Sequence, residues 1–268
     1  MRVIGHVAVN VFKESVRDKV LYNLVVFAVL LIGVSNLLGQ LTAGQDVKII
    51  KDLGLAAISA FGLLIAIFIG IGLVWKEVER RSIYSLLSKP ITRPQFILGK
   101  YAGLAVTLLV NVGVMTVAFY VVLAYMNTQF PDNVRASWPA PATDPGMLRA
   151  ILLIVFELLL VTAIALFFST FSSPFLSAAL TFGLWAIGHF NADLRNFEAV
   201  VDSRAAANVA RGLYYVLPNF AAFDIRSQVV YALRVPAAYV ATTALYGAVY
   251  IALLLTGAVV IFAKRDFK

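Results

Sequence analysis

One stretch of the chain, residues 76–100, concentrates charged side chains between two long apolar runs. Its sequence, KEVERRSIYSLLSKPITRPQFILGK, contains six Lys or Arg residues together with two Glu residues. Carboxylates and guanidinium groups this close together can form charge-assisted hydrogen bonds with a complementary protein surface. The stretch therefore predicts a docking surface, carried by Glu77, Glu79, Arg80, Arg81, Lys89, Pro90, Arg93 and Lys100. The simpler alternative is that these charges only retain the segment on the cytoplasmic side.

Glu157 is the second residue with chemical potential, because it is the only acidic residue deep inside an apolar run. Inserting a charge at such a position costs about 2.5–3.5 kcal/mol, so the side chain should face the protein interior, a partner subunit or water. Two interpretations follow. Glu157 either belongs to a polar translocation route, or it is a packing residue that is hydrogen-bonded to Asn111, Thr107 or Thr162.

Several kinds of chemistry are excluded by composition and spacing. The chain has no Cys, and its only two His residues are His6 and His189, so most metal sites and nucleophilic triads cannot be assembled. Residues 94–101 resemble the end of a phosphate-binding loop, but Pro94 and Tyr101 stand where Gly and Ser or Thr are needed. We therefore expect no cofactor, no metal and no catalytic residue.

The composition identifies the class of protein that must position these residues. Hydrophobic residues make up 61% and charged residues 13% of the 268 residues, and the mean hydropathy is +0.89. Soluble domains have about 45–50% apolar and about 25% charged residues. The chain is thus predicted to be an all-α, polytopic membrane protein in the lipid bilayer. The net charge of +8 fits loops retained in the cytoplasm better than nucleic-acid binding.

The chain is predicted to contain an interfacial amphipathic helix over residues 1–19, followed by a six-span membrane domain over residues 20–268. A span needs about 20 apolar residues. The fifth is short, so the fourth and fifth could also form a hairpin that does not fully cross. The six runs lie at about 20–39, 53–75, 101–125, 149–171, 174–191 and 237–262.

The distribution of Lys and Arg sets the expected orientation. If both termini are cytoplasmic, residues 1–19, 76–100 and 263–268 carry 13 basic and 5 acidic residues, against 9 and 8 in the outer loops. This bias favours a cell-membrane protein with both termini inside. The outer loop at 192–236 has a helical apolar period that Pro218 ends, so we expect a structured loop that contacts an extracytoplasmic partner, lipid headgroups or a substrate gate.

The charged stretch also carries a resemblance. Its pattern E-x-E-R-R…L-L-S-K-P…R…G-K resembles the first cytoplasmic loop of ATP-binding-cassette type-2 transporter permeases, and it is most similar to the branch associated with multicopper-enzyme maturation. The string Leu217-Pro218-Asn219-Phe220 before the last run is similar to a recurring element of that family. The resemblance covers nearly the whole chain, although only the first loop is specific.

The resemblance implies a permease subunit that binds no nucleotide itself. It further implies a second copy of the chain as a homodimer partner, and a separate cytoplasmic ABC ATPase that docks on residues 76–100. Residues 1–19 would then be the connecting helix. Two other functions stay open: a mechanotransmitter or scaffold that delivers force to extracytoplasmic proteins, and an ion-coupled transporter that uses Glu157 as its proton site.

Overall fold

The computed structural model describes residues 2–39, 46–79, 92–190, 208, 211–212 and 214–264. Within these ranges the chain is helical and has no β-strand, which confirms the predicted all-α fold. The elements, in chain order, are α1 (Arg2–Val16), α2 (Lys19–Gly39), α3 (Asp46–Glu79), α5 (Arg93–Gln129), α6 (Asp132–Arg135), α7 (Met147–Ser169), α8 (Pro174–His189), the 3-10 helix η2 (Phe220–Phe223), α11 (Arg226–Val230) and α12 (Ala237–Lys264).

Four of the described helices, α3, α5, α7 and α12, are long and apolar enough to cross a membrane. The bent pair α1 and α2 adds a fifth candidate span if it is counted as one. This differs from the predicted six, and α8 accounts for part of the difference. With 16 residues, α8 is about 24 Å long, whereas the hydrocarbon core of a bilayer is about 30 Å thick. The structure therefore favours a hairpin of α7 and α8 whose second arm does not fully cross.

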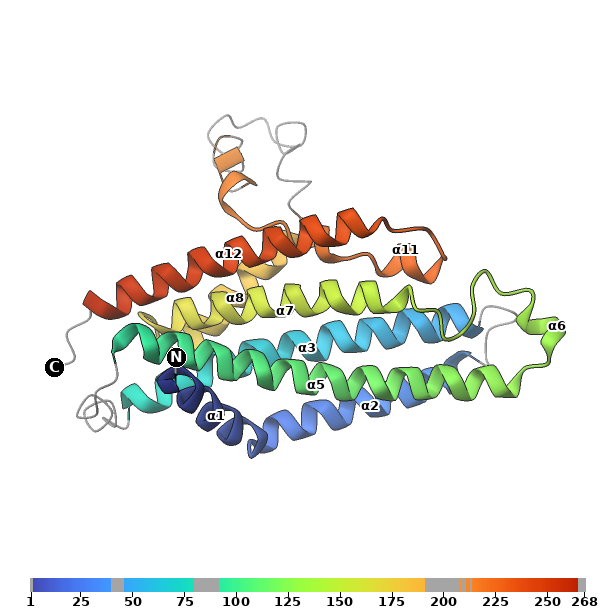
Figure 1. The fold of residues 1–268 in the computed structure, drawn as a ribbon, viewed down its shortest axis with the longest axis horizontal. Helices are drawn as coiled ribbons and strands as arrows, with labels where there is room; N and C mark the ends of the chain where they lie inside the picture. Colours follow the sequence, from blue (N-terminus) through green and yellow to red (C-terminus); the bar gives the residue numbers. More distant parts are fainter. Residues whose placement is uncertain are drawn as a thin grey trace.

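The helices form an elongated bundle in which α3 and α7 occupy the centre (Figure 1). Most of α3 and α7 is buried inside the protein, whereas α5 and α12 face mainly outward. α1, the first turn of α5 and the last turn of α12 lie toward the same end of the bundle (Figure 1). Arg93 links two of them, because its Nη1 donates to the carbonyl of Ala263 at 2.6 Å. The described parts of the three segments that were predicted to be cytoplasmic therefore lie toward one end of the bundle.

The opposite end is held together by two basic side chains from spans. Lys51 on α3 is buried, and its Nζ donates to the carbonyl of Pro141 at 2.8 Å. Arg149 on α7 donates through Nη1 to the carbonyl of Val235 at 2.7 Å. These contacts attach the segment before α7 and the segment before α12 to the bundle.

The helix predicted at the N-terminus exists, and it packs against the beginning of α5. It is bent by 65° from α2, and Asp18 caps α2 by accepting from the amide of Val20 at 2.9 Å. Two glycines of α5 make the approach close. A Cβ on Gly99 would lie 2.7 Å from the Cβ of Val7, and one on Gly103 would lie 2.6 Å from the carbonyl oxygen of Ala8. α1 is thus seated directly beside the end of the 76–100 segment.

Replacing Gly103 by leucine is expected to displace α1 from α5. The new side chain would meet backbone as well as side chain of α1, and overpacking of this kind costs about 1–3 kcal/mol. Thermal unfolding of the purified protein in detergent would show a lower Tm. Gly113→Leu is the matched control, because a Cβ on Gly113 of the same helix meets nothing within 4 Å. Equal Tm values for the two variants would contradict this packing.

The segment between α8 and α12 folds back into the bundle in its described part. Phe220 and Phe223 are fully buried, and η2 contacts both α7 and α8. A Cβ on Gly188 would lie 2.6 Å from the carbonyl of Pro218, and one on Gly247 would lie 3.1 Å from the ring of Phe223. Gly247 is about 15 Å from the start of α12, so this part of the predicted outer loop reaches into the bundle. Residues 192–207, 209–210 and 213 of that loop lie outside the described residues.

The backbone of this inserted segment finds hydrogen-bond partners on α12. The amide of Asn219 donates to the hydroxyl of Tyr246 at 2.8 Å, and the hydroxyl of Tyr239 donates to the carbonyl of Ala222 at 2.8 Å. Non-helical backbone at membrane depth is tolerated only where protein or water satisfies its polar groups. Two tyrosines of α12 fulfil this requirement.

Candidate functional site

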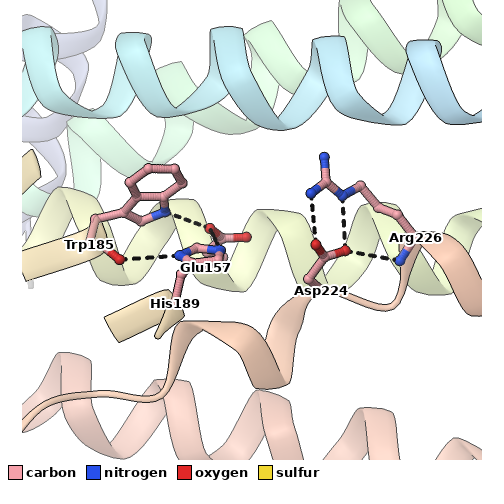
Figure 2. Close-up of polar contacts among 5 residues, drawn as sticks. All are labelled: Glu157, Trp185, His189, Asp224 and Arg226. Atoms are coloured by element: carbon pink, nitrogen blue, oxygen red, sulfur yellow. Dashed lines mark hydrogen bonds and ion pairs between the residues drawn. The ribbon is translucent and has the colours of Figure 1, made fainter. Parts of the chain in front are cut away.

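Glu157 lies at the centre of a buried polar cluster formed by α7 and α8 (Figure 2). Its side chain is only 3% exposed. The indole Nε1–H of Trp185 donates to Oε1 of Glu157 at 2.8 Å. The Nε2 atom of His189 lies 3.7 Å from the same oxygen. The acidic side chain inside α7 therefore has two aromatic partners from the neighbouring helix.

The geometry of α8 brings these two partners together. Trp185 and His189 are four residues apart, so they lie on one face of the helix, and their ring centroids are 4.5 Å apart. Nδ1 of His189 lies 3.1 Å from the carbonyl oxygen of Trp185. On its other side the imidazole stacks on the ring of Phe220, with the centroids 5.9 Å apart and the planes within 6°. The imidazole is thereby fixed against both α8 and the inserted segment.

The contact at Nδ1 determines which proton the cluster can move. A carbonyl oxygen only accepts hydrogen bonds, so we assign a proton to Nδ1 of His189. Nε2 then carries either a lone pair or a second proton. Glu157 and His189 can accordingly share one proton, as a neutral acid beside a neutral imidazole or as an ion pair. Both forms have zero net charge, which reduces the cost of keeping the carboxyl group inside the protein.

A second charged pair lies near this cluster, formed by Asp224 at the end of η2 and Arg226 at the start of α11 (Figure 2). Arg226 donates to Asp224 through Nε at 2.9 Å, through Nη2 at 2.7 Å and through its backbone amide at 3.1 Å. These hydrogen bonds hold the pKa of Asp224 below its ordinary value and raise the pKa of Arg226. Both groups are therefore charged at neutral pH, and Glu157 interacts electrostatically with each of them.

The predicted docking residues are placed only in part. Arg80, Arg81, Lys89 and Pro90 lie outside the described residues. Glu77 and Glu79 belong to the last turns of α3. α3 continues past its apolar part as far as Glu79. α5 restarts at Arg93 with Thr92 as its N-cap and with Gln95 completing a capping box.

The two predicted docking residues that the structure describes, Arg93 and Lys100, differ in their accessibility. Arg93 is partly buried and donates to the carbonyls of Phe262 and Ala263 at the end of α12. Lys100 is completely buried, with its Nζ 4.8 Å from the centroid of the Phe96 ring. In this conformation Lys100 therefore packs inside the protein and does not present its charge to a partner.

The sequence did not reveal the partners of Glu157. Of the three suggested, Thr107 and Thr162 donate to carbonyls of their own helices, those of Gly103 and Leu158. The structure places Trp185 and His189 there instead. One signal was available, because a histidine four residues after a tryptophan ends an otherwise apolar run. Among the described residues no group of three or more His, Cys, Asp or Glu side chains could hold a metal.

Comparison with known proteins adds one finding. A sequence profile of the family described as "ABC-2 family transporter protein" matches residues 6–267 of the chain. A comparison with proteins of curated function finds no match. The matched range begins within α1 and includes every later described element to the end of α12.

Proposed function

The chain belongs to the ABC-2 family of transporter proteins, and from that membership we propose that it is a permease subunit driven by a separate cytoplasmic ATPase. Members of such a family are multi-pass membrane subunits, as the apolar helices of this chain require. We propose that the ATPase docks on residues 76–100, that both termini face the cytoplasm and that a second copy of the chain completes the membrane unit. An extracytoplasmic partner at 192–236 is part of the same proposal.

The continuity of α3 and α5 is the observation that best supports docking at residues 76–100. α3 has 34 residues and α5 has 37, and each runs from this segment through a full apolar span. A stiff helix transmits a displacement of its end along its whole length, about 50 Å in each case. α3 also packs against α7, which carries Glu157. A push on the segment would therefore reach the buried polar cluster through a helix that touches the neighbouring span.

Glu157 is proposed as the residue of the translocation route that responds to this movement. It is buried between α7 and α8, and its imidazole partner touches the inserted segment through Phe220. Any shift of α8 or of that segment must change the contact between Glu157 and His189. The proposed route thus contains the contact between Glu157 of α7 and His189 of α8, two helices that can move relative to each other.

Reversing two charges tests the docking assignment. Glu77→Arg combined with Arg81→Glu should prevent the ATPase from co-purifying with the permease and should remove coupled ATP hydrolysis. Truncating a close charge pair at an interface costs 2–5 kcal/mol, so the affinity should fall by about thirtyfold or more. The measurements are subunit stoichiometry and ATP turnover of the reconstituted complex.

The matched control reverses an exposed pair at the opposite end of the bundle. Asp132 and Arg135 form a salt bridge within α6, so Asp132→Arg with Arg135→Glu swaps the same kinds of charge without touching the docking segment. This control should assemble and turn over ATP as the unaltered protein does. If the Glu77 and Arg81 variant did so too, residues 76–100 would not be the docking surface.

The Glu157–His189 contact favours a second candidate function, a proton-coupled transporter without an ATPase. Carboxyl and imidazole groups buried inside a membrane protein are the groups from which proton relays are built. Vesicles that contain only this chain distinguish the two functions. If the chain is a proton-coupled transporter, an acidic external solution should acidify the lumen of these vesicles. Glu157→Gln should abolish that acidification. If the chain is an ATPase-driven permease, neither the unaltered protein nor the Glu157→Gln variant should conduct protons.

A further inference from the structure

A pocket of about 270 Å³ lies where the beginning of α7 meets the segment between α11 and α12. Two guanidinium groups line it, those of Arg149 in the first turn of α7 and of Arg234 shortly before α12. Both residues are exposed, so a bound molecule can reach their side chains. Neither the docking segment nor the Glu157 cluster contributes a residue to this pocket.

The backbone holds the two arginines beside the same pocket. Ala232, just after α11, has a φ of 59°, a left-handed conformation that is common directly after the end of a helix. The segment that follows is tied to α7, because Arg149 donates through Nη1 to the carbonyl of Val235 at 2.7 Å. Val235 is the residue after Arg234. The backbone at Arg234 is therefore held next to the first turn of α7.

No carboxylate among the described residues pairs with either guanidinium group. Arg234 forms no hydrogen bond or ion pair with them, and Arg149 donates only to a backbone carbonyl. Asp144 also lines the pocket, but its Oδ1 accepts from the amide of Gly146 at 2.8 Å. A guanidinium group stays charged at any physiological pH and can only donate hydrogen bonds. The pocket therefore favours an anionic group that accepts them.

The position of the pocket indicates what carries this anionic group. α7 and α12 pack against each other, and both begin toward the end of the bundle where α11 lies (Figure 1). With 23 residues α7 is about 35 Å long, slightly more than the hydrocarbon core of a bilayer, so its first turn lies at the level of the lipid head groups. Leu148 and Leu152 of α7 and Leu233 of the lining are exposed beside the two arginines. A phosphate that is attached to acyl chains matches both the charge and this apolar surface.

We propose that this pocket binds the phosphate group of a membrane phospholipid. Arg149 and Arg234 donate to the phosphate oxygens, for which the planar fork of a guanidinium group is well suited. The acyl chains lie along the exposed leucines of α7. The site goes beyond energy coupling, because none of its residues belongs to the docking segment. Binding also needs no nucleotide, so its test is independent of any ATPase.

The test measures lipid retention by native mass spectrometry on the full chain, purified and titrated with phosphatidylglycerol. Monoglucosyl diacylglycerol with the same acyl chains is the comparison lipid, because its head group has no phosphate. Retention of phosphatidylglycerol should exceed that of the glucosyl lipid. Arg234→Gln should weaken binding of phosphatidylglycerol by about tenfold or more, the effect of losing hydrogen bonds to a charged group. It should leave retention of the glucosyl lipid unchanged.

The matched control removes the same charge from a neighbouring place. Arg135 belongs to α6, at the same end of the bundle, and it does not line the pocket (Figure 1). Arg135→Gln therefore lowers the net charge as Arg234→Gln does, but it should retain phosphatidylglycerol as the unaltered protein does. The Tm of each variant is measured alongside, so that a loss of fold is recognised.

Inorganic phosphate distinguishes a lipid site from a site for a free anion. Millimolar phosphate should displace no more phosphatidylglycerol than chloride at the same ionic strength does, because only the lipid brings acyl chains to the leucines. The proposal is overturned if phosphate does displace the lipid or if the two lipids are retained equally. It is also overturned if a folded Arg234→Gln protein retains phosphatidylglycerol as well as Arg135→Gln does.

Discussion

Replacing Gly188 by leucine is expected to push the segment from Pro218 to Phe223 out of the bundle. A Cβ at position 188 would lie 2.6 Å from the carbonyl oxygen of Pro218 and 2.5 Å from the ring of Phe220. A backbone carbonyl cannot rotate away as a flexible side chain can, so the segment as a whole must move. The buried rings of Phe220 and Phe223 would then lose their contacts, and emptying one such site typically costs about 3–5 kcal/mol.

The absence of cysteine from the sequence makes this displacement directly measurable. A single Val229→Cys replacement places a thiol at a position that is 4% exposed, so a maleimide reagent should label it slowly. Adding Gly188→Leu should accelerate labelling and lower the Tm. Gly183→Leu is the matched control in the same helix, since a Cβ there meets nothing within 4 Å. Slow labelling in both double variants would show that the segment does not depend on Gly188.

Replacing Glu157 by glutamine should reduce transport by at least about tenfold and leave assembly intact. The amide keeps an oxygen that can accept the Nε1–H of Trp185, so the contact that holds α7 to α8 persists. It cannot take up or release a proton as a carboxyl group can. The measurement is ATP-driven transport by the reconstituted complex, and Glu14→Gln in the exposed face of α1 is the matched control.

A leucine at the same position separates transport from packing. Glu157→Leu leaves the indole N–H of Trp185 and the imidazole of His189 without their partner, and each buried unpaired group costs about 1–3 kcal/mol. This variant should lose stability as well as transport. If glutamine and leucine impaired assembly equally, Glu157 would be a packing residue and not a part of the route.

The local elements of this protein could be predicted from the sequence because each has a local cause. Long apolar runs gave the positions of α3, α5, α7 and α12, and the amphipathic period of residues 1–19 gave α1. The residues at the start of α5 likewise have local signals of a helix N-terminus. Thr92 and Gln95 form a capping box, and Pro94 lies in the first turn. Helix periodicity and capping act within a few residues, so a sequence displays them directly.

The candidate site depends on contacts that no local pattern shows. Glu157 and His189 are 32 positions apart and meet only because α7 and α8 form a tight hairpin. The apolar residues Phe220 and Phe223 read the same in the sequence whether their segment covers the bundle from outside or inserts into it. Insertion depends on Gly188 and Gly247, which let the segment pack closely against α8 and α12. These contacts exist only in the folded protein.

The seat of α1 on α5 has a consequence for biosynthesis. The groove that receives Val7 and Ala8 is made by Gly99 and Gly103, which leave the ribosome roughly 90 residues later. Protein synthesis adds about 5–20 residues per second, so about 5–20 s pass between the synthesis of α1 and that of its binding surface on α5. During that interval α2 and α3 are synthesised, whereas the surface of α5 that receives α1 does not yet exist. Its amphipathic pattern provides a resting place on the membrane surface for this delay.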